Sequence, residues 1–158
     1  MSSYSCNQNN FPIIDIGYYI LREKTLDDVQ DFFKYYSDPE VSKYIVSSIP
    51  ETLEEAKYEL KYWINVFNSG DGIYFGLAKK DNNQLIGTVG LSGISKVHNR
   101  IEASYDLAKE YWNQGIMTKA LKAVVKYGFE VMKINRIEAN SLKENIGSRS
   151  ILKKCGFI

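Results

Sequence analysis

The sequence predicts a single domain of the mixed α/β class, and three observations support that prediction. The chain has 158 residues, of which 44% are hydrophobic and 25% are charged, a composition typical of one compact domain with a sizeable core. Apolar residues recur at helical spacing in some segments and at every second position in others, so we expect both helices and strands. Between Arg100 and Asn140 the pattern changes from strand to helix and back to strand, which predicts a right-handed parallel crossover.

The first half of the chain predicts one strand followed by two helices. Tyr18–Arg22 is rich in β-branched and aromatic residues and favours a strand. The sequence Thr-Leu-Asp-Asp at 25–28 is typical of a capping box and starts a helix that ends before Pro39. A second helix starts after Thr52 and ends at the loop 68–72. The apolar stripe of the first helix is expected to comprise Leu26, Val29, Phe33 and Tyr36.

The second half predicts four strands and two helices. Alternating residues at 73–78 and 85–94 flank a polar turn and predict a β-hairpin. The strand Arg100–Ala108 alternates between an apolar and a polar face, and an amphipathic helix follows over 115–132. A strand at 135–140 and a short helix at 145–154 complete the order. The apolar face of Arg100–Ala108 comprises Ile101, Ala103, Tyr105 and Leu107, and the polar face comprises Arg100, Glu102, Ser104 and Asp106.

Composition argues against several classes of protein. Twenty Lys and Arg against nineteen Asp and Glu give a net charge of +1, which lacks the excess that attracts nucleic acid. No apolar run reaches the length of a membrane span, and the polar leader 1–12 lacks the features of a secretory signal, so we expect a cytoplasmic protein whose domain covers 13–158. Two cysteines and one histidine argue against a metal site and a disulfide scaffold.

A loop between a strand and a helix is the first candidate for a binding site. The segment 112–118, Trp-Asn-Gln-Gly-Ile-Met-Thr, leads directly into the amphipathic helix. Unpaired N–H groups and the dipole at such a helix start favour a phosphate group. A plain turn that contains Gly115 is the alternative, and spacing alone does not decide between the two.

A second motif at 145–157, Asn-Ile-Gly-Ser-Arg-Ser-Ile-Leu-Lys-Lys-Cys-Gly-Phe, changes this balance. Together with the loop it resembles the GNAT (general N-acetyltransferase) superfamily, and more narrowly the branch that contains the ribosomal-protein N-terminal acetyltransferases. The resemblance implies a central twisted mixed sheet with four helices around it. Relatives continue with two more strands, which implies that the domain is truncated at its C-terminal end. Three alternatives stay open: a fragment, a homodimer in which a neighbouring chain supplies those strands, or an exposed sheet edge.

The resemblance also implies where acetyl-CoA would bind. The backbone around Gly115 would hold the pyrophosphate, and a strand edge would hold the pantetheine arm. Met117 stands where the family has Gly or Ala, so either its side chain turns into the core or the loop opens. Asn145 would bond the pantetheine amide or cap the last helix. The residues implied for acetyl-CoA are Asp106, Leu107, Ala108, Trp112, Gln114, Gly115, Ile116, Met117, Thr118 and Asn145.

The implied reaction moves an acetyl group from the CoA thioester to a primary amine, either a protein N-terminus such as that of a ribosomal protein or a small amine. Glu102 is the candidate base, and a solvent-facing carboxylate is the alternative. Ser148 is the candidate acid, because Leu152 stands where many relatives have a tyrosine; a surface hydroxyl is the alternative. The expected acceptor pocket contains Tyr35, Tyr44 and Tyr62. A CoA-binding or sensory module with weak or no activity is the alternative function.

Overall fold

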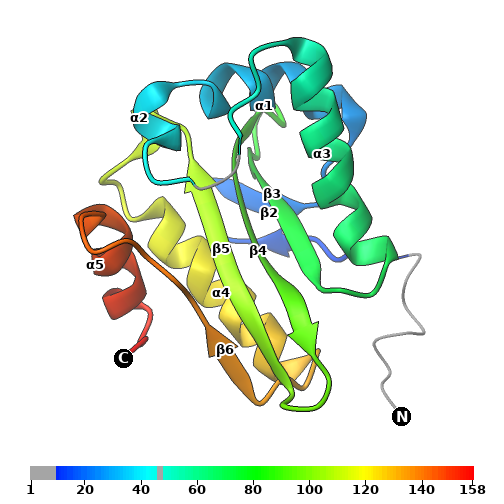
Figure 1. Cartoon of the computed structure of the whole chain (residues 1–158), viewed down its shortest axis with the longest axis vertical. Coiled ribbons are helices and arrows are strands. Elements are labelled where there is room, and N and C mark those ends of the chain that lie inside the picture. The colour runs from blue at the N-terminus through cyan, green and yellow to red at the C-terminus, as the bar shows by residue number, and fades with distance from the viewer. Residues whose placement is uncertain (1–9, 46–47) are drawn as a thin grey trace.

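The computed structural model describes residues 10–45 and 48–158, so Cys6 and most of the polar leader lie outside it. Six strands form one sheet in chain order (Figure 1). Neighbouring strands are antiparallel except for the last pair, which is parallel as the predicted crossover requires. The strands are β1 (Ile14–Asp15), β2 (Tyr19–Arg22), β3 (Ile73–Lys79), β4 (Leu85–Ser95), β5 (Arg100–Leu107) and β6 (Arg136–Glu138).

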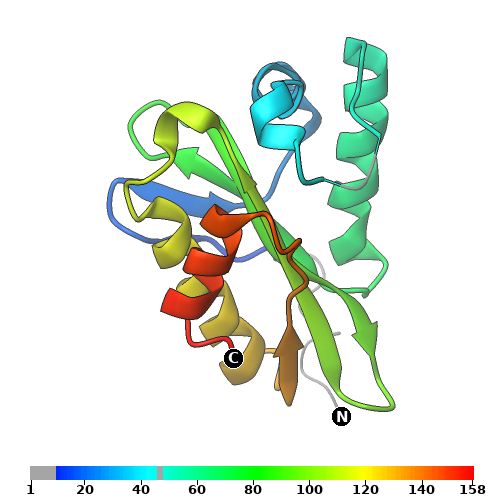
Figure 2. The ribbon, with the colours of Figure 1, turned by 60° about the vertical axis from the view of Figure 1, so that its left-hand side comes forward.

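Helices cover both faces of the sheet. Figure 2 shows α4 and α5 on one side and α1, α2 and α3 on the other, and each side has its own buried hydrophobic cluster. This mixed α/β architecture matches the prediction, with the one-turn α2 added to the four expected helices and the two-residue β1 added to the five expected strands. The helices are α1 (Val29–Tyr36), α2 (Pro39–Ser42), α3 (Leu53–Asn68), α4 (Ile116–Glu130) and α5 (Ile146–Lys154), with short 3₁₀ turns η2 (Leu26–Asp28) and η3 (Lys109–Tyr111). None of the described helices is long and apolar enough to cross a membrane.

The predicted stripe of the first helix is partly right: Tyr36 is buried, and Val29 and Phe33 pack against the buried cluster from half-buried positions. The buried side chains of α1 are Phe32, Tyr35 and Tyr36, whereas Leu26 is exposed and Phe33 is half-buried. The 3₁₀ turn η2 explains the exposure of Leu26, because its three residues per turn change the phase before the α-helix begins at Val29. Within α1, the buried Tyr35 bonds to Asp106 of β5.

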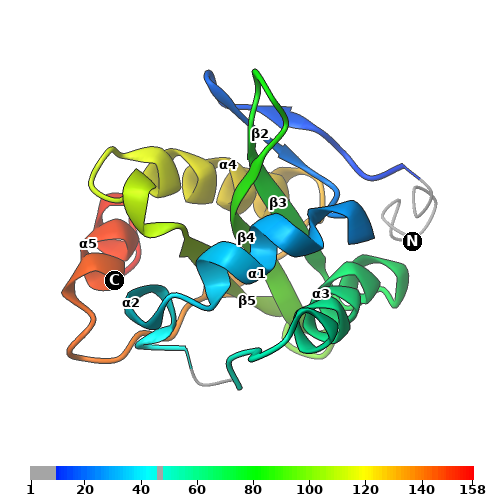
Figure 3. The ribbon, with the colours of Figure 1, turned by 90° about the horizontal axis from the view of Figure 1, so that it is seen from above.

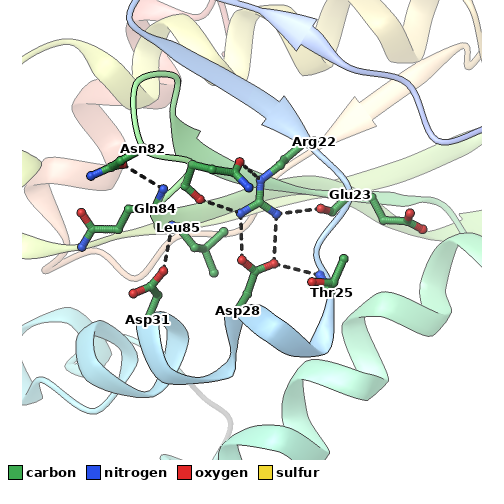
Figure 4. Close-up of polar contacts among 9 residues, drawn as sticks. Arg22, Glu23, Thr25, Asp28, Asp31, Asn82, Gln84 and Leu85 are labelled. Carbon is green, nitrogen blue, oxygen red and sulfur yellow. Dashed lines mark hydrogen bonds and ion pairs between the residues drawn. The ribbon is translucent and has the colours of Figure 1, made fainter.

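An ion pair fixes α1 to the sheet at the end of β2 (Figure 4). The guanidinium of Arg22 donates to both carboxylate oxygens of Asp28, at 2.8 and 2.9 Å. Its other N–H groups donate to the carbonyl of Glu23 and to two oxygens of Asn83. Asp28 also accepts from the Thr25 N–H, at 2.8 Å. This anchor holds α1 in place over β4, as the view from above shows (Figure 3).

Candidate active site

The short strand β6 pairs with only the beginning of β5. Their parallel register covers Arg100–Glu102, after which β5 runs on to Leu107 and the chain after β6 turns away toward α5 (Figure 1). On the other side, the Ala108 N–H donates to the Ile86 carbonyl of β4 at 2.8 Å. Because N–H groups of a strand alternate in direction, the backbones of Leu107 and Tyr105 point away from β4, toward the side where β6 diverges. An extended ligand can add to this edge as a further strand.

The indole of Trp112 bonds to the end of this edge. Its Nε1–H donates to the Leu107 carbonyl oxygen at 2.8 Å. Of the three residues expected to hold pantetheine, Leu107 therefore presents its N–H to the divergent side, whereas Asp106 and Ala108 direct their backbones toward β4. Trp112 reaches this edge through Leu107.

The start of α4 is open to a ligand. Gly115 precedes the helix with φ 76°, and a Cβ placed there would meet no atom within 4 Å. The Lys119 N–H donates to the Gly115 carbonyl, which leaves the N–H groups of the first turn outside the helical ladder. Within the described residues, no side chain caps this turn and it contains no acidic residue. The arrangement suits a phosphate.

Neighbours of Gly115 occupy distinct environments. Met117 is 3% exposed and packs in the core beside Ile116, so its side chain turns inward, the first of its two expected alternatives. Gln114 is exposed and its side-chain amide donates to the Glu110 carbonyl. Thr118 is half-buried, and its carbonyl accepts from the Cys155 thiol. None of these three side chains therefore fills the open space beside Gly115.

At the start of α5, Asn145 caps the helix. Its Oδ1 accepts from the Ser148 N–H at 3.1 Å. The Ser148 hydroxyl lies 2.7 Å from the phenol oxygen of Tyr105, which also lies 3.1 Å from the Ser148 carbonyl oxygen. Burial raises the pKa of the Tyr105 phenol. A tyrosine hydroxyl thus stands beside Ser148, while Leu152 is buried in the core.

Tyr105 is a candidate that the sequence analysis missed as a functional residue. The alternation placed it with the apolar face of its strand, and that face does turn toward α5. One signal in the sequence pointed to it: Tyr105 is the one residue on the apolar face of β5 whose side chain carries a polar group. What the sequence did not show is that Ser148 lies opposite it.

The polar face of β5 turns toward α1 and α3. Glu102 is exposed, and its carboxylate accepts from the side-chain amide of Asn140. Ser104 lies 2.7 Å from the Tyr74 hydroxyl. Asp106 is half-buried: it accepts from the Tyr35 hydroxyl at 2.7 Å on one oxygen and from the Thr88 hydroxyl at 2.8 Å on the other.

A buried lysine lies behind this face and was not anticipated. Lys24 is 2% exposed, and its Nζ lies 4.4 Å from the ring centroid of Tyr74. Burial lowers the pKa of Lys24 to about 7, and the charges of Asp106, Asp28 and Glu59 oppose that shift. Burial also raises the pKa of Asp106, against the hydrogen bonds from Tyr35 and Thr88 and the charge of Lys24.

The three tyrosines expected in the acceptor pocket separate. Tyr35 contacts the Asp106 carboxylate from α1. Tyr44 donates to the Glu144 carbonyl at 3.2 Å and so links the end of α2 to the segment before α5. Tyr62 is 62% exposed on α3 and packs on Trp63, whose ring in turn packs on Tyr74. Two aromatic rings thus separate Tyr62 from β5.

Comparison with known proteins decides the family. A family model described as an acetyltransferase (GNAT) domain matches residues 19–158, nearly the whole chain. The chain belongs to the GNAT family of acetyltransferases. This GNAT protein is thus an N-acetyltransferase, and family membership implies acetyl-CoA as the donor and an amine as the acceptor.

Similar proteins include enzymes with named acceptors. YoaA of Bacillus subtilis, an uncharacterized N-acetyltransferase, is 31% identical over 93% of this GNAT chain and 83% of its own. The ribosomal protein uS5 alanine N-acetyltransferase of Escherichia coli is 30% identical over 60% of this chain and half of its own. A GNAT-family acetyltransferase structure from Bacillus anthracis has a TM-score of 0.80, with 25% identity over 92% of this chain and 82% of its own. The ribosomal-protein-S5-alanine acetyltransferase of Vibrio fischeri has a TM-score of 0.81 at 22% identity, over 93% and 83%, and shows the same fold.

Proposed function

We propose that this GNAT protein moves the acetyl group of acetyl-CoA to the primary amine of a protein N-terminus or of a small molecule. The observation that carries the proposal is one juxtaposition: the open start of α4 follows, after the short turn η3, the β5 edge that β6 leaves unpaired. A phosphate-binding turn at one end of a free strand edge suits a ligand with an anionic head and an amide-containing arm.

The donor would lie along these two features. The backbone N–H groups of Gly115–Thr118 would face the pyrophosphate, and the edge at Tyr105 and Leu107 would bond the pantetheine amides. Trp112 would act through Leu107, since it occupies the carbonyl of that residue and leaves the N–H for the ligand. Asn145 would act through its cap, which stabilises the start of α5 beside this edge.

Transfer to an amine requires the chain to handle protons at both ends of the reaction. An ammonium must lose a proton before its nitrogen attacks, and the departing thiolate must gain one. The hydroxyl groups of Ser148 and Tyr105 are candidates to supply the proton that the departing thiolate needs. For the ammonium, Glu102 and Asp106 both lie on the polar face of β5. Two carboxylates on this face favour a cationic acceptor, and acceptors of this charge include the N-terminal amines for which the ribosomal relatives are named.

Donor binding is tested by a single glycine variant. Gly115→Val should weaken acetyl-CoA binding by about tenfold or more, because a side chain at this positive φ is strained and projects where the phosphates would lie. Isothermal titration calorimetry measures the affinity. Gly70→Val is the matched control: Gly70 has φ 78° and open space around its Cβ position, but it follows α3, away from this site.

Turnover is tested separately, by release of CoA thiol with an alanine-initiated peptide and with spermidine as acceptors. Turnover with either amine supports the transferase. Binding of acetyl-CoA without turnover on any amine of a wider panel would favour the alternative of a CoA-binding or sensory module. Failure to bind acetyl-CoA would contradict both.

A further inference from the structure

We propose that the Asp106 carboxylate, held by the Tyr35 and Thr88 hydroxyls, receives the acceptor's ammonium group and takes its proton. The inference rests on the proposed function and deepens it, because it assigns the amine-binding group of the site. It makes Asp106 a catalytic residue and makes Tyr35 and Thr88 positioning residues. It also moves the base from Glu102, where the sequence placed it.

The position of Asp106 along β5 is the first argument. Its side chain leaves the strand between Tyr105 and Leu107, the two residues whose backbone N–H groups face the divergent side. A thioester carbonyl bonded to either N–H therefore lies within one residue of Asp106. Glu102 lies four residues earlier, about 13 Å along the strand at 3.3 Å per residue. It stands where β5 still pairs with β6, and its carboxylate already accepts from Asn140.

The bonding of the carboxylate is the second argument. The Tyr35 hydroxyl donates to one oxygen and the Thr88 hydroxyl to the other, and the Thr88 backbone also bonds to the carboxylate. Because a carboxylate accepts about four hydrogen bonds, Asp106 keeps capacity for a further donor. The residue Asp106 is half-buried, on the face of β5 that also carries Ser104 and Glu102. The two hydroxyls fix the orientation of the carboxylate before an amine arrives, which is the preorganisation that a general base needs.

The charged groups around Asp106 suit an acceptor ammonium that binds and is released. Lys24 lies behind the site from the end of β2, with Asp28 from η2 and Glu59 from α3 around it. Tyr35 and Tyr36 face the site from α1, and Tyr74 faces it from β3. The net result of burial is an Asp106 pKa above its ordinary value, closer to the range in which a carboxylate both accepts and releases a proton.

The proposed step balances as follows. The acceptor R–NH₃⁺ gives one proton to the Asp106 carboxylate and becomes R–NH₂. The nitrogen lone pair forms a C–N bond to the thioester carbonyl carbon, and collapse of the resulting adduct breaks the C–S bond. The second nitrogen proton passes to the thiolate sulfur through the hydroxyls at Ser148 and Tyr105 or through water. Asp106 releases its proton to solvent, so that R–NH₃⁺ and acetyl-CoA give R–NH–acetyl, CoA thiol and H⁺.

Kinetics of three variants test this assignment. With the acceptor that the wild-type protein turns over, Asp106→Asn should lower kcat by about a hundredfold or more, and Glu102→Gln should lower it much less. Tyr35→Phe keeps the carboxylate but removes a hydrogen bond that lowers its pKa, so the acidic limb of the kcat profile should shift to higher pH. Asp27→Asn, a change at an exposed carboxylate in η2, is the control for loss of charge. If Asp106→Asn does not fold, the shift caused by Tyr35→Phe decides the question.

A binding measurement separates this inference from the proposed function. Spermidine is titrated into the protein saturated with CoA, and Asp106→Asn should weaken its binding by about tenfold through loss of a charge-assisted hydrogen bond. Turnover in the wild type with an unchanged Asp106→Asn profile overturns the inference and leaves the transferase standing. Acetyl-CoA binding without any turnover contradicts the transferase and the proton transfer, and Asp106-dependent binding of spermidine would then retain the ammonium site alone.

Discussion

Two cations only two residues apart meet nearby carboxylates in opposite ways. Arg22 uses each of its five N–H groups, two of them on Asp28. The Nζ of Lys24 instead lies over the Tyr74 ring, 4.4 Å from its centroid, and Asp106 bonds to the Tyr35 and Thr88 hydroxyls. The first pair is saturated and holds α1 on the sheet. In the second pair, the Asp106 carboxylate can accept a further hydrogen bond, so it can bind a proton or an amine.

The chemistry of the two side chains explains this difference. A guanidinium is a planar fork that matches a carboxylate at two points and stays charged, whereas an ammonium is a compact charge that loses its proton when it is buried. Arg22 therefore suits a permanent joint. Lys24 suits a place where the local charge has to change.

Loss of the saturated pair should have the largest effect. Arg22→Lys leaves Asp28 buried with a partner that cannot reproduce the two-point contact, and we expect the free energy of unfolding to fall by about 3 kcal/mol. Urea denaturation measures the change. Lys80→Met is the control, because it breaks the exposed Lys80–Asp15 pair and should cost under about 1 kcal/mol. Equal losses in the two variants would mean that Arg22–Asp28 is no stronger than a surface pair.

Replacement of Lys24 should change the free energy of unfolding in the opposite direction. Lys24→Met should raise the free energy of unfolding by about 2 kcal/mol at pH 6, because a charged lysine is no longer buried. The Lys24 pKa of about 7 lies below its ordinary value. Between these values the unfolded wild-type chain binds more protons than the folded one, so wild-type stability rises with pH.

The advantage of Lys24→Met should therefore shrink as the pH rises from 7 to 10. Urea midpoints of both proteins across this range measure the difference. An advantage that stays constant with pH would show that Lys24 titrates normally in the folded state.

The smallest effect is expected at the hydroxyl that faces Asp106 from β4. Thr88→Val removes one hydrogen bond and should cost about 1 kcal/mol of unfolding free energy. The same change raises the Asp106 pKa further, so the acidic limb of the kcat profile should move to higher pH. Ser69→Ala, which removes a hydroxyl bond to the Val66 carbonyl at the end of α3, is a stability control that should leave the profile unchanged. A limb that does not move in Thr88→Val would separate Asp106 from the rate.

The sequence predicted those parts of the site that depend on local spacing. The alternation of Arg100–Ala108 predicted both faces of β5, whereas the loop before α4 stayed open between a phosphate site and a plain turn until the family resemblance favoured the phosphate site. Whether the Met117 side chain turns into the core or the loop opens could not be predicted, because the same local sequence is compatible with both arrangements. Local patterns therefore predicted most of the fold, whereas the expected donor site came from the family resemblance and stays a prediction.

The parts that were missed depend on contacts between distant segments. Tyr35 meets Asp106 across 71 positions, and Tyr105 meets Ser148 across 43. The exposure of Leu26 depended on the three-residue 3₁₀ turn η2 before α1. The burial of Lys24 had no local signal at all, since a lysine after a short strand ordinarily lies in solvent.

The buried lysine also depends on a glycine in the neighbouring strand. A Cβ at Gly76 would lie 2.9 Å from Lys24 Cγ and 2.9 Å from a methyl of Leu85, so the aliphatic stem of Lys24 occupies the space that a side chain would need. Positions 24 and 76 are thus coupled, and Gly76→Ala should be tolerated better once residue 24 is shortened. Among homologous sequences, the two positions should covary: a long cation at one should accompany glycine at the other.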